Sequence, residues 1–181
     1  MIFTTDPYGH ISYICVEWTQ YTGQSRTDVY AYEWVTPILP KDRDTVARTL
    51  AQAAQARAEF SIRFRVKHTD GSIRWLAAGG VPSFGPPGRS FLGFLGSMTE
   101  FAPTAAPEMT SYGKIERFIP PPTHHATRAQ SPLDTIADHL LIAHALMEQH
   151  KQPFGLQGVK TALREVGCAL ASGEGSQVRL N

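Results

Sequence analysis

Apolar and polar positions alternate through much of the first hundred residues. Over residues 60–67 every second position is apolar (FSIRFRVK), which predicts a half-buried antiparallel strand with a basic outer face. The Asp70-Gly71 pair predicts a tight hairpin turn into a second strand over residues 73–81. A third strand is expected over residues 91–98, and two short strands are expected around the turn formed by residues 6–9 (DPYG).

Helical spacing appears in the middle and at the end of the chain. Residues 42–57 begin with acidic side chains and carry apolar positions about one turn apart, which predicts a helix. Near the end, Ser131 and Pro132 favour a helix start, and a second helix begins at Leu156 with apolar residues spaced 3, 4, 3 and 4 apart. Together these two segments predict a helical hairpin.

The distribution of proline divides the chain. Six of the 13 prolines fall within residues 101–132, which predicts a proline-rich linker with a possible short docked element at 112–119. The expected organisation is therefore a strand-rich domain over 1–100, the linker over 101–132, a helical hairpin over 133–172 and a disordered tail over 173–181.

Composition narrows the function classes without identifying one. The net charge is +1 over 181 residues, so neither a nucleic acid nor a membrane surface is an expected partner. No stretch is apolar enough for a membrane span, the N-terminus has no signal-peptide pattern, and two cysteines cannot make a disulfide framework. These features favour a cytoplasmic protein. Cys15 is expected to be a small buried hydrophobic residue.

Five short segments, in order, carry a family resemblance. They are TDPYGHISYI, EWTQYTGQS, LPKDR, FRVKHTDGSIRW and FLGFLGSMTE, and together they span about residues 1–100. This region resembles a PAS domain, and more closely the subgroup whose signature runs from an aspartate-glycine turn to an arginine-tryptophan pair. The sequence begins at the first strand, so pairing through the N-terminal helix that many PAS domains use is not expected.

The resemblance implies an α+β fold, with a five-stranded antiparallel sheet and helices on one face, followed by the C-terminal α-helical hairpin. It also implies a sensory or interaction module of signal transduction. PAS domains hold a small ligand between sheet and helices or bind a partner domain through the sheet. The candidate ligand-pocket residues are aromatic, although an ordinary core position accounts for any single one of them as well: Trp34, Phe64, Trp75 and Phe94.

The resemblance also raises the question of a cofactor. Flavin-binding photosensors of the family need a cysteine after the second strand, and residues 23–38 contain none. Haem-binding relatives need an axial imidazole, and residues 25–57 contain no histidine. The cofactor therefore stays unknown, with a haem- or flavin-type gas or redox sensor as the alternative function.

The helical hairpin has more apolar surface than it can bury on itself, so it is expected to dock on the sheet or on a second copy. The partners that the resemblance implies are a second copy of this chain, forming a homodimer, a signalling protein, or both. The candidate interaction and dimerisation residues lie along both helices: Leu140, Met147, Leu156, Val159, Leu163 and Val166.

Histidines in the hairpin raise one further alternative, a sensory fragment of a histidine kinase. His139, His144 and His150 lack the acidic residue and the proline that accompany a phosphoacceptor histidine, and we expect them to lie on the surface. No hydrolase, zinc-protease or nucleotide-binding motif is present, and no metal site is expected. The leading hypothesis is a non-enzymatic sensory or interaction protein whose C-terminal helices relay a signal.

Overall fold

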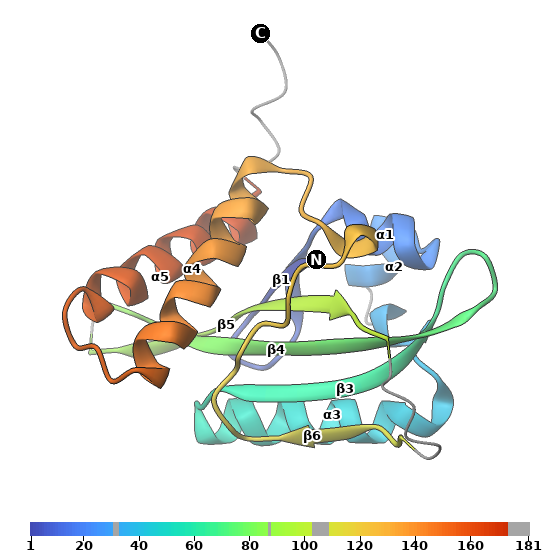
Figure 1. Cartoon of the computed structure of the whole chain (residues 1–181), viewed down its shortest axis with the longest axis horizontal. Coiled ribbons are helices and arrows are strands. Elements are labelled where there is room, and N and C mark those ends of the chain that lie inside the picture. The colour runs from blue at the N-terminus through green and yellow to red at the C-terminus, as the bar shows by residue number, and fades with distance from the viewer. Residues whose placement is uncertain (31–32, 87, 103–108, 174–181) are drawn as a thin grey trace, which may run out of the picture.

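The computed structural model describes residues 1–30, 33–86, 88–102 and 109–173, and it is an α+β protein (Figure 1). In these ranges an antiparallel sheet has the strand order β2-β1-β5-β4-β3-β6. The strands are β1 (Ile2–Thr5), β2 (Ile11–Ile14), β3 (Phe60–Lys67), β4 (Ile73–Gly85), β5 (Ser90–Glu100) and β6 (Tyr112–Lys114). The helices are α1 (Val16–Thr22), α2 (Arg26–Tyr30), η1 (Glu33–Val35), α3 (Pro40–Ala56), η2 (His125–Thr127), α4 (Pro132–Gln149) and α5 (Leu156–Ser172).

The fold class predicted from the sequence is confirmed, but the described part of the sheet has six strands and the expectation of five was wrong. The sixth strand is β6, which lies inside the predicted docked element at 112–119 and pairs with β3. Phe118 in the same segment is buried, so this part of the predicted linker is packed against the domain. The predicted disordered tail falls almost entirely on residues 174–181, outside the described ranges.

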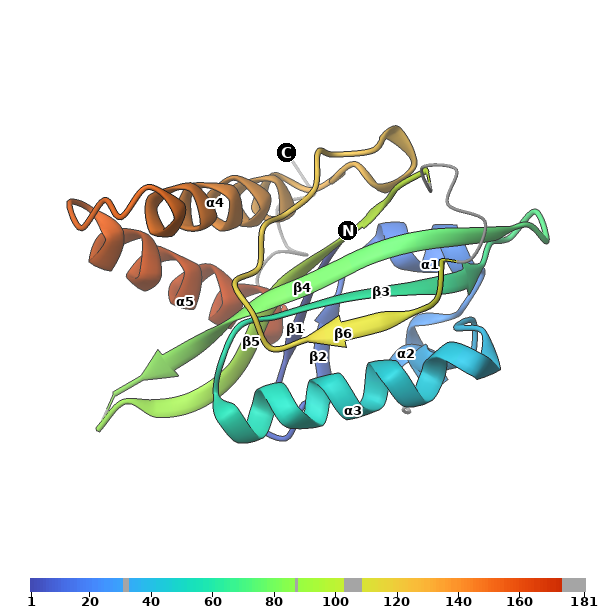
Figure 2. The ribbon, with the colours of Figure 1, turned by 60° about the horizontal axis from the view of Figure 1, so that its bottom comes forward.

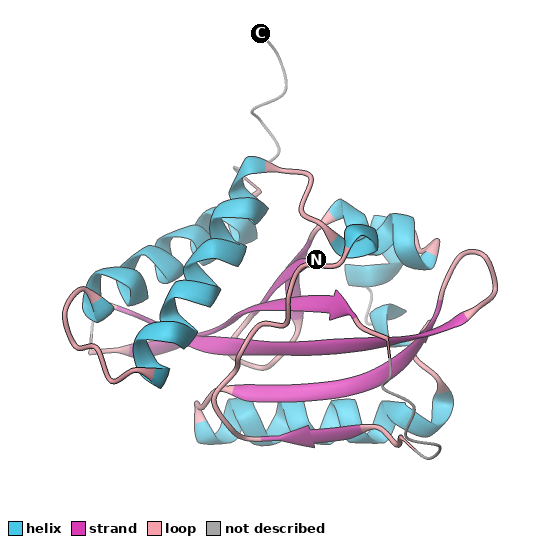
Figure 3. Cartoon of the chain, viewed as in Figure 1, coloured by secondary structure: helices cyan, strands magenta, loops and turns pink. Residues whose placement is uncertain are grey.

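Helices cover both faces of the sheet. Figure 2 shows α3 on one side and the α4–α5 hairpin on the other, and Figure 3 shows the strands between these helical layers. We call the face covered by α1, α2 and α3 the inner face and the face covered by α4 and α5 the outer face. Each face has its own apolar core, because alternate residues of a strand point to opposite sides.

A close backbone approach fixes the segment that follows β6. The ring of Phe118 lies over Gly79 of β4, where an added Cβ would collide with this ring and with the carbonyl oxygen of Phe60. Because Gly79 has no side chain, the Phe118 ring can pack directly on β4 in the outer core. This contact holds the segment that leads from β6 to α4 against the sheet.

Replacing Gly79 by alanine is expected to displace Phe118 and to lower the free energy of unfolding by about 2 to 3 kcal/mol, in the range for overpacking a filled core. Chemical denaturation measures this loss. Gly158 of α5 is the matched control, because an added Cβ there meets no atom within 4 Å. Alanine at Gly158 should stabilise the helix by about 0.5 to 1 kcal/mol. Equal effects at the two positions would contradict the role given to Gly79.

Candidate functional site

The inner face contains a small cavity that is entirely apolar. Its volume is about 20 Å³, which is close to the space that one water molecule needs. No polar side chain lines it among the described residues, so a water inside would find no hydrogen-bond partner there. The cavity fits a diatomic gas or a methyl-sized group. Its walls are formed by Phe3, Ile11, Ile14, Trp34, Val46, Leu50, Phe60, Ile62, Phe64, Ala78 and Met98.

The predicted pocket residues do not share one location. Trp34 and Phe64 line the cavity. Phe94 is buried in the same core, where its ring meets the edge of the Phe60 ring with centroids 5.1 Å apart. These three residues occupy the inner face, between the sheet and the helices that cover it.

The expectation for Trp75 was wrong, because this side chain points to the outer face. Its strand neighbour Leu76 is buried in the inner core, so Trp75, one position earlier, must face the other way. The guanidinium of Arg65 lies over the Trp75 ring at 5.2 Å, and the Phe101 ring lies 6.2 Å away. Trp75 therefore contributes to the outer surface and not to the cavity.

The cavity does not fit the cofactors considered from the sequence. A haem or flavin ring system is many times larger than 20 Å³, and the described lining contains neither histidine nor cysteine. Elsewhere in the described ranges, no group of three histidine, cysteine or carboxylate side chains is arranged to hold a metal ion. Cys15 is fully buried, and burial raises the pKa of its thiol far above the ordinary value. The thiol therefore stays protonated at neutral pH.

An ion pair fastens α3 to the sheet beside the cavity. Asp42, in the first turn of α3, accepts hydrogen bonds from Arg65 of β3: from the backbone N at 2.8 Å, from Nε at 2.9 Å and from the terminal guanidinium nitrogen at 2.6 Å. Burial alone would raise the pKa of Asp42, but these hydrogen bonds outweigh it and lower the pKa below its ordinary value. The carboxylate therefore holds one cavity wall in place.

A second polar cluster joins the inner domain to the hairpin. Tyr13 of β2 donates a hydrogen bond of 3.0 Å to Asp134 of α4, and Ser131 donates one of 2.6 Å to the other carboxylate oxygen. Glu17 of α1 accepts a hydrogen bond of 2.6 Å from the backbone N of Gln130. Both carboxylates are buried, so the start of α4 is attached to β2 and to α1.

Burial makes this cluster sensitive to pH. It raises the pKa of Asp134, and nearby Glu17 raises it further, although the hydrogen bonds from Ser131 and Tyr13 lower it. An acid whose pKa is higher in the folded state binds more protons there than in the unfolded state. The contribution of Asp134 to stability therefore decreases as pH rises through the window above its ordinary pKa of 3.8, and it stays constant at higher pH.

The hairpin docks on the outer face through a second apolar core. Leu163 and Leu170 of α5 and Leu141 of α4 pack against Ile2 and Leu95 of the sheet. Of the predicted interaction residues, Leu163 is buried in this core, and Leu140, Val159 and Val166 are partly buried against it. Met147 and Leu156 are half-buried. Most of the predicted interaction residues are therefore at least partly buried by contacts within the chain.

The histidines of the hairpin differ in burial. His139 and His150 are exposed as expected, but the expectation for His144 was wrong, because it is buried between the hairpin and the sheet. Asp134 and Glu17 were also not recognised as buried carboxylates. A Ser131 cap three residues before Asp134 was the available signal, but its burial depends on where the hairpin docks.

In the described ranges no helix combines the length and apolar character needed to cross a lipid bilayer.

The comparisons with known proteins concern mainly the first half of the chain. Residues 11–93 match a family model described as "PAS fold". Uncharacterized protein y4lL of Sinorhizobium fredii is 32% identical over 96 residues, and the match covers 53% of this chain and 12% of that protein. The chain therefore spans only a small part of this curated relative.

Solved structures show similarity at low sequence identity. The PAS-B domain of Drosophila melanogaster Cycle, with bound ethylene glycol, is 13% identical with a TM-score of 0.45, covering 55% of this chain and 98% of that one. A PAS domain from Colwellia psychrerythraea is 22% identical with a TM-score of 0.45, covering 55% and 84%. VqmA of Vibrio cholera, in a complex with ligand and DNA, is 12% identical with a TM-score of 0.41, covering 98% and 85%.

Proposed function

Residues 11–93 of this chain form a PAS domain, a sensory and signalling domain, and from this we propose that the protein is a non-enzymatic sensor whose α4–α5 hairpin relays the state of the inner core. In the proposed cycle the hairpin exchanges between a docked arrangement on the outer face and a released one. A ligand or partner that prefers one arrangement shifts the population toward it.

One observation carries this proposal: strand β2 touches both the cavity and the hairpin. Ile11 and Ile14 of β2 line the cavity, while Tyr13 between them binds Asp134 at the start of α4. Tyr13 also contacts both apolar cores. A ligand that displaces Ile14 would therefore move the hydroxyl group that holds the hairpin.

The size and lining of the cavity favour a small apolar ligand. Any ligand larger than a few atoms must displace side chains of the walls, since about 20 Å³ is available in the docked state. Such displacement is the event that the relay requires. A displacement of β2 then reaches α4 through the single hydrogen bond from Tyr13 to Asp134.

The released hairpin would act on a partner. Release exposes Leu163 and its neighbours along α5, together with the apolar outer face of the sheet. A second copy of this chain or a cytoplasmic signalling protein would bind this surface, which agrees with the partners expected from the sequence.

The relay predicts that a change in the cavity wall on β2 alters hairpin opening. Ile14→Val should change the opening free energy of α4, measured by hydrogen exchange of its backbone amides, by about 0.5 kcal/mol or more. The change should disappear in a Tyr13→Phe background, because the bond to Asp134 is then absent. Tyr13→Phe alone should weaken docking by about 1 to 2 kcal/mol, since Asp134 stays buried without this donor.

Leu50→Ala is the matched control. Leu50 lines the same cavity, but it lies on α3, which packs against β3 and β6. This variant should lower the free energy of global unfolding, as expected for the loss of one core side chain. It should leave the free energy of hairpin opening unchanged. Equal effects of Ile14→Val on hairpin opening with and without the Tyr13 hydroxyl would overturn the relay.

A further inference from the structure

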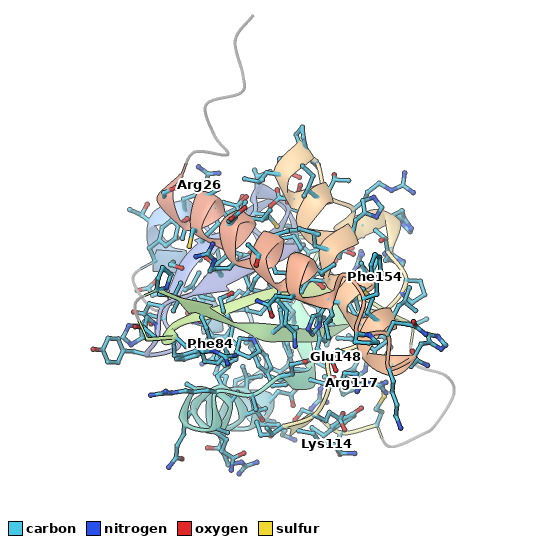
Figure 4. All side chains as sticks on the ribbon, turned by 90° about the vertical axis from the view of Figure 1, so that its left-hand side faces the viewer. Arg26, Phe84, Lys114, Arg117, Glu148 and Phe154 are labelled. Carbon is cyan, nitrogen blue, oxygen red and sulfur yellow. The ribbon has the colours of Figure 1, made fainter. Side chains whose placement is uncertain are left out.

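A second, larger hollow lies on the outer face, away from the cavity of the PAS core. It is a groove of about 600 Å³ between the β4–β5 hairpin and α5, within the size range of small-molecule sites. Figure 4 looks at this side of the molecule, with α5 in front and Phe84 and Glu148 labelled. One wall is formed by residues 81–86 with Gly88 and Arg89, and the other by α5 with His144 of α4.

One face of α5 lines the groove with polar side chains. Gln157, Lys160, Thr161 and Arg164 follow the spacing of successive helical turns, so their side chains project on the same side. Opposite them, Val81 and Pro86 give the groove apolar lining, whereas the Phe84 ring lies against Phe91, on the inner face. The groove therefore combines an apolar wall with a polar one.

Charge in the groove favours an anion. Its lining contains three cationic side chains, Arg89, Lys160 and Arg164, but one carboxylate, Glu59. Glu59 already accepts a hydrogen bond of 2.9 Å from the backbone N of Phe118, and burial raises its pKa. Fewer negative charges than positive ones thus line this hollow at neutral pH.

Two of these cations already have ion-pair partners. Lys160 lies 3.0 Å from Glu148, which is also 3.8 Å from Arg117. Arg164 lies 3.2 Å from the exposed Glu165, its neighbour in sequence. Surface pairs of this kind contribute little, so a bound oxyanion can take over the Arg164 guanidinium at small cost.

His144 supplies an unsatisfied polar atom at the base of the groove. Its side chain is 4% exposed, Nε2 lies 4.0 Å from a Glu148 oxygen, and Nδ1 has no hydrogen-bond partner among the described residues. Burial, followed by Lys160, lowers the pKa of His144 although Glu148 raises it, so the ring is neutral at pH 7. A buried polar atom without a partner is costly, and a ligand that reaches it would remove that cost.

We propose that this groove binds a small organic anion. An aromatic or aliphatic body would lie against Val81 and Pro86, and a carboxylate or phosphate head would be held by Lys160 and Arg164. Such a ligand would contact both the β4–β5 hairpin and α5, so its binding would favour the docked hairpin. This site is separate from the inner cavity and does not depend on the relay through Tyr13.

Phenyl phosphate and benzoate are suitable probes, with benzyl alcohol as the neutral analogue. Titration of the full chain, followed by backbone amide shifts in nuclear magnetic resonance, should show saturable changes in residues 83–85, 88–89 and 157–164. Benzyl alcohol should bind at least tenfold more weakly. A Lys160→Gln, Arg164→Gln double variant should raise the Kd of phenyl phosphate at least tenfold.

Arg26→Gln is the control variant, because Arg26 is an exposed arginine on α2 that does not line the groove. It should leave the Kd unchanged. Equal affinity for benzyl alcohol, an unchanged Kd in the double variant, or shifts confined to the inner cavity would each overturn the proposal. His144→Leu adds a second readout: it should raise the melting temperature of the free chain and weaken phenyl phosphate binding.

Discussion

A chain with aspartate in place of Leu163 is expected to release its α4–α5 hairpin while the PAS core stays folded. Leu163 is 3% exposed in the centre of the outer core. The substitution removes about 2 kcal/mol of apolar burial and places a carboxylate against the apolar side chains of Ile2 and Leu95, where its desolvation is costly. Amides of α4 and α5 should exchange on the order of 100-fold faster, whereas those of β3 should keep most of their protection.

Release of the hairpin also exposes the apolar outer face, so this variant should self-associate more readily in light scattering. Ile136→Asp is the matched control, since Ile136 lies on α4 and is 48% exposed. It should leave both exchange and association near those of the unmodified chain. Cooperative loss of protection in β3 along with α5 would show that the hairpin and the PAS core unfold as one unit, which contradicts a releasable hairpin.

An Asp42→Asn chain is expected to lose about 3 kcal/mol of stability, because one partner of a buried ion pair is neutralised. For a protein of this size the melting temperature should fall by roughly 6 to 12 °C. Asp42 is 1% exposed, whereas Asp44, two residues later, pairs with Arg48 and has an 84% exposed side chain. Asp44→Asn is therefore the control and should change stability by less than about 0.5 kcal/mol.

The same variant should alter the response to acid. The pKa of Asp42 is lower in the folded protein than its ordinary value of 3.8. Its stabilising contribution is therefore complete above that value and is lost as pH falls through the folded-state pKa. Denaturation curves between pH 5 and 2 should show a smaller loss for Asp42→Asn than for the unmodified chain. Parallel losses in both would assign the acid response to other carboxylates.

Local signals were sufficient for several elements of this chain. Alternation over residues 60–67, the Asp70-Gly71 turn and the Ser131 cap each depend on neighbours in sequence, and the structure has a strand, a hairpin turn and a helix start at these places. The PAS resemblance likewise rests on short segments in order along the chain, and the family match over residues 11–93 confirms it.

Orientation of side chains was harder to derive. Trp75 is an aromatic residue on β4, the strand that pairs with the β3 strand of Phe64. Residue type alone therefore favoured a place for Trp75 in the pocket. The phase of β4 against β3 places Leu76 opposite Phe64 and turns Trp75 outward. A single-residue shift in register exchanges the two faces of a strand, and nothing within the strand itself decides between them when both faces carry apolar residues.

The sequence by itself determined that this chain has a sheet-based sensory domain followed by an amphipathic helical hairpin. Only the tertiary structure decided that the hairpin covers the outer face, and that it buries Leu163, Asp134 and His144 there. An amphipathic helix specifies that one side must leave water, but not which surface receives it. That choice depends on the shape and contacts of the sheet, among them Tyr13 of β2 and the close approach of Phe118 to Gly79.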